Sequence, residues 1–250
     1  MSLGALVGAS GGLVYHLRAS RYRRSLWQPF VRSLGGWLAQ IETPNTRLIL
    51  VGPSAGYCLR DEFFQRFEEV VLCEPDPLAL WLLSSRLERL GIRHVVRRAD
   101  DLLIAPLLHG ELGLGGLLEQ EPHSALAFCN VLGQVRFLLS ESDFERWLGA
   151  FRERIAPRLA GRAWFSFHDR VSGELAPRLE APCLSPRALD DGELLARFYA
   201  TAPERARPFE LTDHHTARIF PRELPRAYFA WQLAPARHYL VEGVAGLQRI

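Results

Sequence analysis

The residues best placed to bind a ligand lie in the stretch RLILVGPSAGY, from Arg47 to Tyr57. Its apolar run, 48–51, breaks at Gly52 and passes through small residues to Gly56, after which an amphipathic pattern begins. This order predicts a buried strand, a tight turn and the N-terminus of a helix. Such a turn directs free backbone N–H groups at a ligand, which makes it suited to a nucleotide-like cofactor.

A second apolar run, 70–73, ends on Glu74. An acid at the tip of the strand after such a turn can hold a ribose, because an ionised carboxylate accepts hydrogen bonds from both hydroxyls. Asp76 is the alternative acid, although it could instead cap a helix that Pro77 opens at its first position. The plainer interpretation of Glu74 is a solvated acid at a strand end.

The composition narrows the classes of function. A chain of 250 residues with 48% hydrophobic and 23% charged residues is typical of one large globular domain, or of a domain with an extension. Its net charge of +2 gives no general attraction to nucleic acid or to anionic membranes. All 30 basic residues are arginine, which excludes Schiff-base, P-loop and kinase-type lysine chemistry.

The cysteines and the N-terminus predict a cytoplasmic protein. The four cysteines are far apart and form no C-x-x-C pair, so buried free thiols in a reducing compartment are expected: Cys58, Cys73, Cys129 and Cys183. The apolar, Gly-rich N-terminus has no basic region and is too short to cross a bilayer. We therefore expect neither a signal peptide nor a membrane helix.

Apolar periodicity predicts alternating strands and helices after a helical first segment. Residues 11–42 are expected to be helical, with breaks near Pro29 and Gly35–Gly36, and with one apolar stripe: Leu13, Leu17, Leu26, Phe30, Leu34, Trp37, Leu38 and Ile41. Strands are expected at 47–51, 70–74, 94–97, 124–129, 163–168, 228–233 and 238–244, and further helices at 57–67, 77–90, 112–119, 141–159 and 190–200. The last two strands are predicted to form an antiparallel hairpin.

This order of elements resembles the class I S-adenosylmethionine-dependent methyltransferases over residues 45–247. The signature of that family at the first strand is an acid followed by three glycines at alternate positions. The corresponding residues are Leu50, Gly52, Ser54 and Gly56, so the acid and the middle glycine are replaced. A nicotinamide fingerprint fits less well, because it would need glycine at Tyr57.

The resemblance implies S-adenosylmethionine as cofactor and a role for each matching position. Gly52, Ser54 and Gly56 would approach the methionyl part, Glu74 the ribose, and Asp100 or Asp101 the adenine. Either aspartate could instead cap the helix that follows. Asn130, after the fourth strand, would lie against the cofactor and face the acceptor. The D/N-P-P-Y/F signature of DNA and protein amino-methylating enzymes is absent.

Further polar residues follow the fifth strand and precede the hairpin. Because open parallel sheets bind ligands at the carboxyl ends of their strands, Asn130, His168 and Asp169 are expected to rim one crevice, with His168 as the first candidate for a general base. The alternative is that His168 and Asp169 only satisfy neighbouring backbone groups. His214 is expected to line the acceptor pocket and His215 to lie on the surface. A metal site formed by Asp169 and one of these histidines with Asn130 is the alternative.

The fold predicted is a doubly wound, three-layer α/β/α domain with a seven-stranded, mostly parallel sheet ending in the antiparallel hairpin. Residues 1–44 would form an N-terminal helical cap on the domain 45–250. A basic run at 18–24 is expected to be a solvated helix face, or to meet the cofactor carboxylate, rather than to grip RNA. The function predicted is methyl transfer to a small molecule, without nucleic acid or membrane partners; a homodimer is left open.

Three alternatives to that function remain open. The replaced residues Leu50 and Ser54 are compatible with a catalytically degenerate binding protein. The acceptor could also be RNA or protein. The third alternative is an enzyme that uses the aminopropyl group of the cofactor; polyamine synthases share the topology, but they depend on paired acids where this chain has Asn130 alone.

Overall fold

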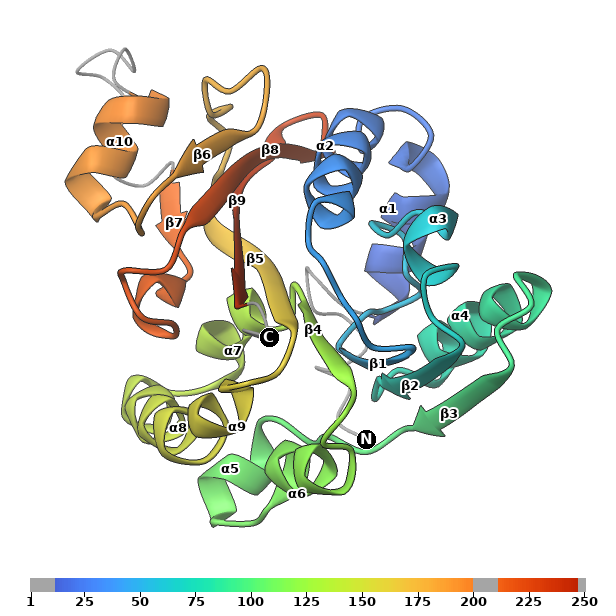
Figure 1. The fold of residues 1–250 in the computed structure, drawn as a ribbon. Helices are drawn as coiled ribbons and strands as arrows, with labels where there is room; N and C mark the ends of the chain where they lie inside the picture. Colours follow the sequence, from blue (N-terminus) through green and yellow to red (C-terminus); the bar gives the residue numbers. More distant parts are fainter. Residues whose placement is uncertain (1–11, 200–210, 247–250) are drawn as a thin grey trace.

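One mixed β-sheet organises the part of the chain that the computed structural model describes, residues 12–199 and 211–246. Its strands lie in the order β3-β2-β1-β4-β5-β9-β8-β6, and β7 pairs with β5 beside this path (Figure 1). The strands are β1 Arg47–Val51, β2 Glu69–Cys73, β3 His94–Arg98, β4 Ala125–Cys129, β5 Trp164–Gly173, β6 Cys183–Ser185, β7 Leu211–Asp213, β8 Arg226–Ala234 and β9 Arg237–Gly246.

The strand directions confirm the predicted fold class. Strands β1 to β5 are mutually parallel, and β9 is antiparallel to both β5 and β8. The prediction of seven strands was wrong by two, because β6 and β7 are short strands in a segment rich in proline and loop-forming residues. The prediction for β5 was too short, since β5 continues to Gly173 along β9.

The helices cover both faces of the sheet and complete three layers (Figure 1). They are α1 Gly12–Tyr22, α2 Gln28–Ala39, α3 Asp61–Phe64, α4 Pro77–Arg89, α5 Ala105–His109, α6 Gly113–Gln120, α7 Leu132–Leu138, α8 Glu141–Arg154, α9 Ala156–Leu159 and α10 Asp191–Tyr199. Helices α1 to α4 share one apolar core with the sheet, and α5 to α9 share the other. Because β1, β2 and β4 are buried on both faces, their sequences are continuous apolar runs.

The N-terminal helices differ in part from the prediction. The break before Pro29 is confirmed, because α1 ends at Tyr22 and α2 begins at Gln28. The break at Gly35–Gly36 was wrong: α2 runs through both glycines, and a Cβ at Gly35 would lie 2.7 Å from the Cδ of Arg60. Leu13 and Leu17, assigned to the apolar stripe, are exposed on α1 at 57% and 62% of their surface. Helix α1 instead buries Tyr15, His16 and Ala19.

The helix predicted at 57–67 was wrong in its extent. Only α3 is helical there, and turns replace its first half, with the N–H of Gly56 bonded to the carbonyl of Pro53. The side chain of Arg86, from α4, donates to the carbonyls of Gly56 and Leu59 at 2.8 and 2.9 Å. These bonds satisfy backbone acceptors that a helix would have satisfied internally. No long helix therefore begins at the turn after β1.

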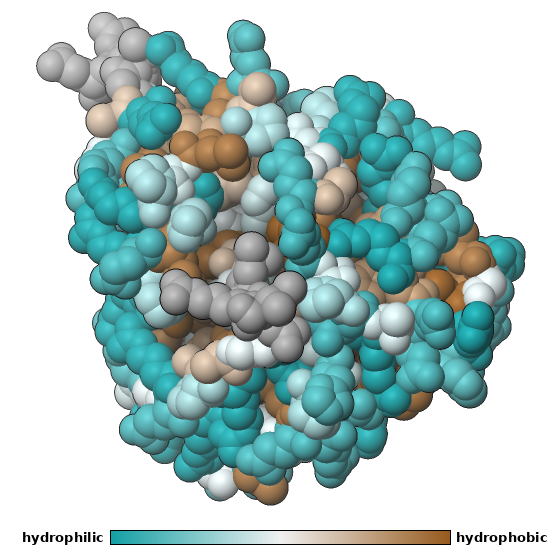
Figure 2. All heavy atoms as spheres, viewed as in Figure 1, coloured by the Kyte–Doolittle hydropathy of each residue, from teal (hydrophilic) through white to brown (hydrophobic). Residues whose placement is uncertain are grey.

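One face of the molecule is mostly polar (Figure 2). Figure 2 shows hydrophilic residues over most of one face, with smaller hydrophobic patches between them. Among the described residues, no helix is long and apolar enough to cross a membrane. The cysteines are free, as predicted, and three of them are buried: Cys58, Cys73 and Cys129.

Gly52 offers a test of this packing. Its φ is +63°, and a Cβ there would lie 2.5 Å from the Cβ of Val131. We expect Gly52→Ala to lower the free energy of unfolding by roughly 2–4 kcal/mol, from backbone strain and overpacking together. Gly149→Ala, which meets nothing within 4 Å in α8, should instead stabilise by ~0.5–1 kcal/mol. Urea denaturation of both variants measures the difference, and equal effects would contradict this account.

Candidate functional site

The turn after β1 and the acid after β2 are joined directly by hydrogen bonds. Gly52, Ser54 and Gly56 all have positive φ, of 63°, 48° and 66°. This conformation brings the backbone N–H of Ser54 to within 2.7 Å of Oε2 of Glu74, while Oε1 accepts from the N–H of Asp76 at 3.0 Å. The carboxylate of Glu74 therefore connects the loops that follow β1 and β2.

Glu74 is buried rather than solvated. Only 7% of its surface is exposed, and burial raises the pKa of its carboxyl to about 7, against the two backbone hydrogen bonds that lower it. Each carboxylate oxygen has two lone-pair positions, and only one on each oxygen is used here. Glu74 therefore retains the capacity to accept hydrogen bonds from a diol.

Asp76 caps α4, and α1 reaches over to it. One carboxylate oxygen of Asp76 accepts from the N–H groups of Leu78 and Ala79, which confirms the capping alternative. Its second oxygen lies 3.2 Å from Nε2 of His16, whose Nδ1 is 2.7 Å from the hydroxyl of Tyr57. His16 thus bridges the loops after β1 and β2 from the side of α1.

Asp100 and Asp101 lie in different surroundings after β3. Asp101 caps the following segment: its carboxylate accepts from the N–H groups of Leu103, Ile104 and Ala105 at 2.8–2.9 Å. Three backbone partners leave this carboxylate little capacity for an adenine amino group. Asp100 is exposed beside it and keeps that capacity.

Asn130 and Asp169 form a two-point latch between the end of β4 and the middle of β5. The N–H of Asp169 donates to Oδ1 of Asn130 at 2.8 Å, and Nδ2 of Asn130 donates to Oδ2 of Asp169 at 3.1 Å. Nε2 of Gln134, from α7, donates to the same Oδ2 at 2.8 Å. Gly133 allows this approach, since a Cβ there would lie 2.8 Å from the backbone nitrogen of Asp169. Asn130 itself has a φ of 60°.

Asp169 is almost fully buried. Its exposed fraction is 1%, and burial raises the pKa of its carboxyl to about 7, although the hydrogen bonds from Asn130 and Gln134 act to lower it. Within the described ranges, Oδ1 of Asp169 has no hydrogen-bond partner. The sequence placed Asp169 at the crevice, but only the structure gives it this environment.

His214 lies beside this latch. Its Nδ1 is 2.7 Å from the carbonyl of Gly133 and its Nε2 is 3.0 Å from the hydroxyl of Ser172. Because a carbonyl can only accept, Nδ1 carries the proton and Nε2 accepts from Ser172. Burial lowers the pKa of His214 to about 4, so its imidazole is neutral near pH 7. His215, expected on the surface, is exposed.

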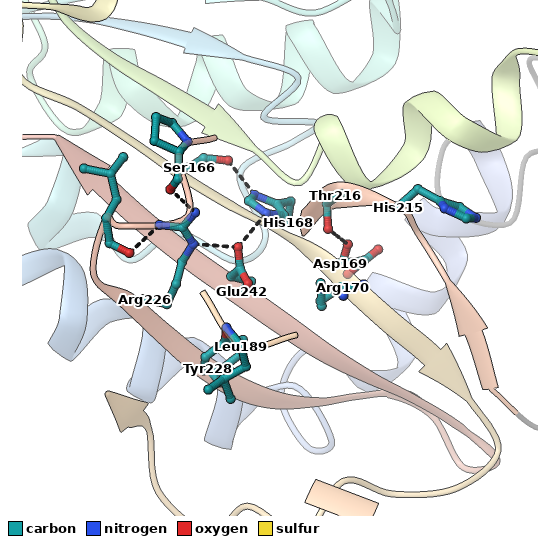
Figure 3. Close-up of polar contacts among 12 residues, drawn as sticks. Ser166, His168, Asp169, Arg170, Leu189, His215, Thr216, Arg226, Tyr228 and Glu242 are labelled. Atoms are coloured by element: carbon teal, nitrogen blue, oxygen red, sulfur yellow. Dashed lines mark hydrogen bonds and ion pairs between the residues drawn. The ribbon is translucent and has the colours of Figure 1, made fainter. Parts of the chain in front are cut away.

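The structure separates His168 from Asn130 and Asp169. His168 has no exposed surface and lies in the interior of the extended β5, where its Nδ1 is 2.8 Å from the hydroxyl of Ser166 (Figure 3). Its Nε2 is 3.5 Å from Oε1 of Glu242, which also accepts from Nε of Arg226 at 2.8 Å. The three residues expected at one crevice therefore lie in two different environments.

The network around His168 is internal and charged. Burial lowers the pKa of His168, against the hydrogen bond and charge of Glu242. Burial alone would raise the pKa of Glu242, but His168 and the charges of Arg226 and Arg170 hold it at about 2. Arg226 also donates to the carbonyls of Leu224 and Pro221. This geometry ties β5, β8 and β9 to the segment before β8 (Figure 3).

Other candidate sites receive less support. Among the described residues, no group of three or more His, Cys, Asp or Glu side chains is arranged to hold a metal ion. An open groove of about 430 Å³ lies between α2 and β6, lined by Arg32, Ser33, Gly36, Trp37, Gln40, Pro182 and Leu184. It includes none of the residues discussed above.

Sequence reasoning missed two contributors to the site. His16 carried no signal, because a single histidine on an amphipathic helix is usually only a packed side chain. Gln134 follows Asn130 by four residues, a spacing that places the two on one side when a helix starts between them. That spacing could have indicated the shared bond to Asp169.

Comparisons with known proteins give remote structural matches only. No family model and no curated protein sequence matches the chain. N-methyltransferase NodS from Bradyrhizobium japonicum WM9, in complex with S-adenosyl-L-homocysteine, has a TM-score of 0.45 and 11% identity, covering 93% of this chain and 98% of that one. The methyltransferase domain of bacterial CtHen1-CN has a TM-score of 0.43 and 10% identity, covering 88% and 98%. An rRNA methylase from Streptococcus thermophilus has a TM-score of 0.37 and 12% identity, covering 85% and 93%.

The environment of Glu74 predicts a pH dependence of stability. Its pKa is about 7 in the folded protein against an ordinary value of 4.5, so the folded state binds this proton more tightly. The stabilisation that comes from this tighter proton binding is fully present below pH 4.5 and is lost as pH rises through 7. Between these limits, we expect the unfolding free energy of Glu74→Gln to rise relative to wild type by about 3 kcal/mol. Urea denaturation across the range measures it; a constant difference would contradict the assignment.

The buried pair of Arg226 and Glu242 predicts a structural role for the His168 network. We expect Arg226→Leu to cost ~3–5 kcal/mol of unfolding free energy, because it leaves the Glu242 charge buried with fewer partners. The double variant Arg226→Leu with Glu242→Leu should recover much of that loss. Arg218→Leu, which breaks an exposed pair with Glu145, should cost ~1 kcal/mol or less. Similar losses for the buried and exposed pairs, by denaturant unfolding, would overturn this interpretation.

Proposed function

We propose that this protein is an S-adenosylmethionine-dependent methyltransferase that acts on a small-molecule acceptor. The observation that carries the proposal is the bond between the turn after β1 and Glu74, at the carboxyl edge of a sheet with five parallel strands and a closing antiparallel pair. Open α/β sheets bind their ligands at this edge. Here a buried acid and a turn of left-handed residues lie next to one another.

The residues present fit the adenosine part of this cofactor. Glu74 has lone pairs left for the two ribose hydroxyls, and Ser54 and Asp76 hold its carboxylate in place. We assign the adenine amino group to Asp100 rather than to Asp101, since Asp101 is committed to capping. Bound there, S-adenosylmethionine supplies an electrophilic methyl group on its sulfonium.

The acceptor side is assigned to the latch and its neighbours. Asn130 lies at the end of β4, between the turn after β1 and Asp169 on β5. His214 stays neutral near pH 7 and is fixed by Gly133 and Ser172, so it can shape this side of the site. His168 as general base remains a prediction from the sequence, and its buried network does not enter the proposal.

Enclosure supports a small acceptor over a polymer. Asp169 and His214 have exposed fractions of 1% and 3%, and α1 lies over the neighbouring loops through Tyr15 and His16. A nucleic acid or protein would require an open face with the reacting residues accessible. In this proposal α1 and α2 act as the cap on the cofactor crevice.

Thermal shift with S-adenosylhomocysteine tests the cofactor assignment. Ligand at 100 times its dissociation constant should add about 2.7 kcal/mol, which raises Tm by roughly 5–10 °C at this size. Glu74→Ala should weaken binding at least ~10-fold, from the loss of one or two charge-assisted hydrogen bonds. Glu153→Ala, which changes an exposed acid on α8, should bind as wild type.

The possible results separate the proposal from its alternatives. No stabilisation by millimolar S-adenosylhomocysteine or S-adenosylmethionine would overturn the cofactor assignment. Full affinity in Glu74→Ala would overturn the ribose assignment alone. Binding without transfer of a labelled methyl group to any small molecule, RNA or protein would support a degenerate binding protein instead.

A further inference from the structure

A buried carboxylate oxygen next to the proposed crevice has no partner within the protein. Asp169 is 1% exposed, and its Oδ2 already accepts from Asn130 and Gln134. Its Oδ1 accepts from no group in the described part of the chain. A buried acceptor left unpaired costs ~1–3 kcal/mol, and more when it is charged. The latch therefore positions a carboxylate whose second oxygen is available to a ligand.

The side chains around Asp169 suit a cation rather than an anion. Asp169 pairs with Val241 across β5 and β9, which places it on the same face of the sheet as Tyr239. Its negative charge is one of the causes that raise the pKa of Tyr15, Cys58 and Tyr239, after burial. All three are neutral near pH 7. The positive charge of Arg237 lowers the pKa of Asp169, and the guanidinium of Arg237 donates to the hydroxyl of Ser172.

A chain of aromatic ring contacts connects Tyr15 with Tyr239. Tyr15 lies 5.4 Å from Trp27, Trp27 lies 5.2 Å from Trp231, and Trp231 lies 5.7 Å from Tyr239, measured between ring centroids. The charge of Asp169 acts on the pKa of both end rings, Tyr15 and Tyr239, and the guanidinium of Arg237 lies 5.6 Å from the centroid of the Tyr239 ring. Aromatic rings attract cations through their electron-rich faces, by ~0.5–2 kcal/mol each. A carboxylate and aromatic rings are the kinds of group that recognise an organic ammonium.

We propose that Oδ1 of Asp169 binds the ammonium group of the methyl acceptor, which makes that acceptor an amine. This inference rests on the proposed methyltransferase function. Asn130 and Gln134 are positioning residues, because they hold Oδ2 so that Oδ1 faces the ligand. The same chemistry could bind the amino group of the cofactor's methionyl part, and the experiment distinguishes the two sources.

Binding of simple amines tests the site without any reaction. Benzylamine and methylamine are titrated into the wild-type protein, with benzyl alcohol and sodium chloride as the matched neutral and ionic controls. We expect at least one amine to stabilise the protein saturably, with a dissociation constant at least ~10-fold below that of its control. Asp169→Asn should remove this preference, whereas Asp143→Asn, at a partly exposed position in the first turn of α8, should retain it. Amines that behave as their controls in the wild-type protein would overturn the proposal.

The pH dependence of the wild-type protein gives a test that does not depend on a variant folding. The pKa of Asp169 is about 7, so amine affinity should rise up to ~10-fold as pH increases from 6 to 8 and the carboxylate ionises. The titratable and charged groups coupled electrostatically to it are Tyr15 from α1, Cys58 from the loop after β1, and Arg237 and Tyr239 from β9; Arg18 from α1 acts in turn on Tyr239. An amine affinity that is flat or falls over this range would contradict the assignment.

The source of the ammonium is decided by comparing two nucleosides. S-adenosylhomocysteine carries the methionyl amino group, and 5′-methylthioadenosine lacks it. If Asp169→Asn binds both as wild type but loses amine binding, the acceptor assignment is supported. If it loses S-adenosylhomocysteine affinity at least ~10-fold while 5′-methylthioadenosine binds normally, Asp169 binds the cofactor and the acceptor proposal is wrong. If wild type binds amines but neither nucleoside, the proposed function fails while the ammonium site stands.

Discussion

The hydrogen bonds accepted by buried carboxylates hold the carboxyl edge of the sheet together. Parallel strands end in loops whose backbone has no neighbouring strand to pair with, so those loops need other acceptors and donors. Glu74 joins the loops after β1 and β2, and Asp169 joins the loop after β4 to β5. Most candidate site residues outside the His168 network lie on or next to one of these two connections; Asp100 and Asp101, after β3, do not.

Both connections use a carboxylate that is buried, and burial disfavours its charged form. Both carboxyls have pKa values raised to about 7 by burial, so at neutral pH each is balanced between its charged and neutral forms. Structural carboxylates in well-formed ion pairs behave in the opposite way, as Glu242 does beside Arg226. The contrast separates a network that stabilises the sheet from two acids whose environments leave them available to a ligand. Perturbed acids in a crevice are typical of functional sites.

The sequence predicted the strands well because their physical signal is local. Strands buried on both faces need continuous apolar runs, and β1, β2 and β4 lie within one residue of their predicted ranges. The turn-rich segment at 53–60 was harder, because Arg86 reaches it from α4, a contact that no local pattern encodes. The short strands β6 and β7 exist only through pairing with distant strands.

The sequence named polar residues near the carboxyl edge, but not which of them contact one another. Asn130 and Asp169, two of the three residues expected at the carboxyl edge, are hydrogen-bonded to each other, and His214 contacts Gly133 beside them. His168 does not join them, because β5 continues past it and alternate residues of a strand point to opposite faces. The local sequence pattern does not locate the end of β5, because its last residues are in a strand through their pairing with β7 and β9.

The two departures from the methyltransferase signature that the sequence resembles carry different physical weight. Leu50 has no exposed surface and packs in the core that α1 to α4 share, so the missing acid leaves a well-packed position rather than a gap in the crevice. Ser54 adopts a φ of 48°, which costs a residue with a Cβ roughly 1–2 kcal/mol. Its N–H repays this strain through the bond to Glu74, and a hydrogen bond to a charged group is worth ~1.5–3 kcal/mol. Ser54 therefore preserves the turn that glycine would otherwise form.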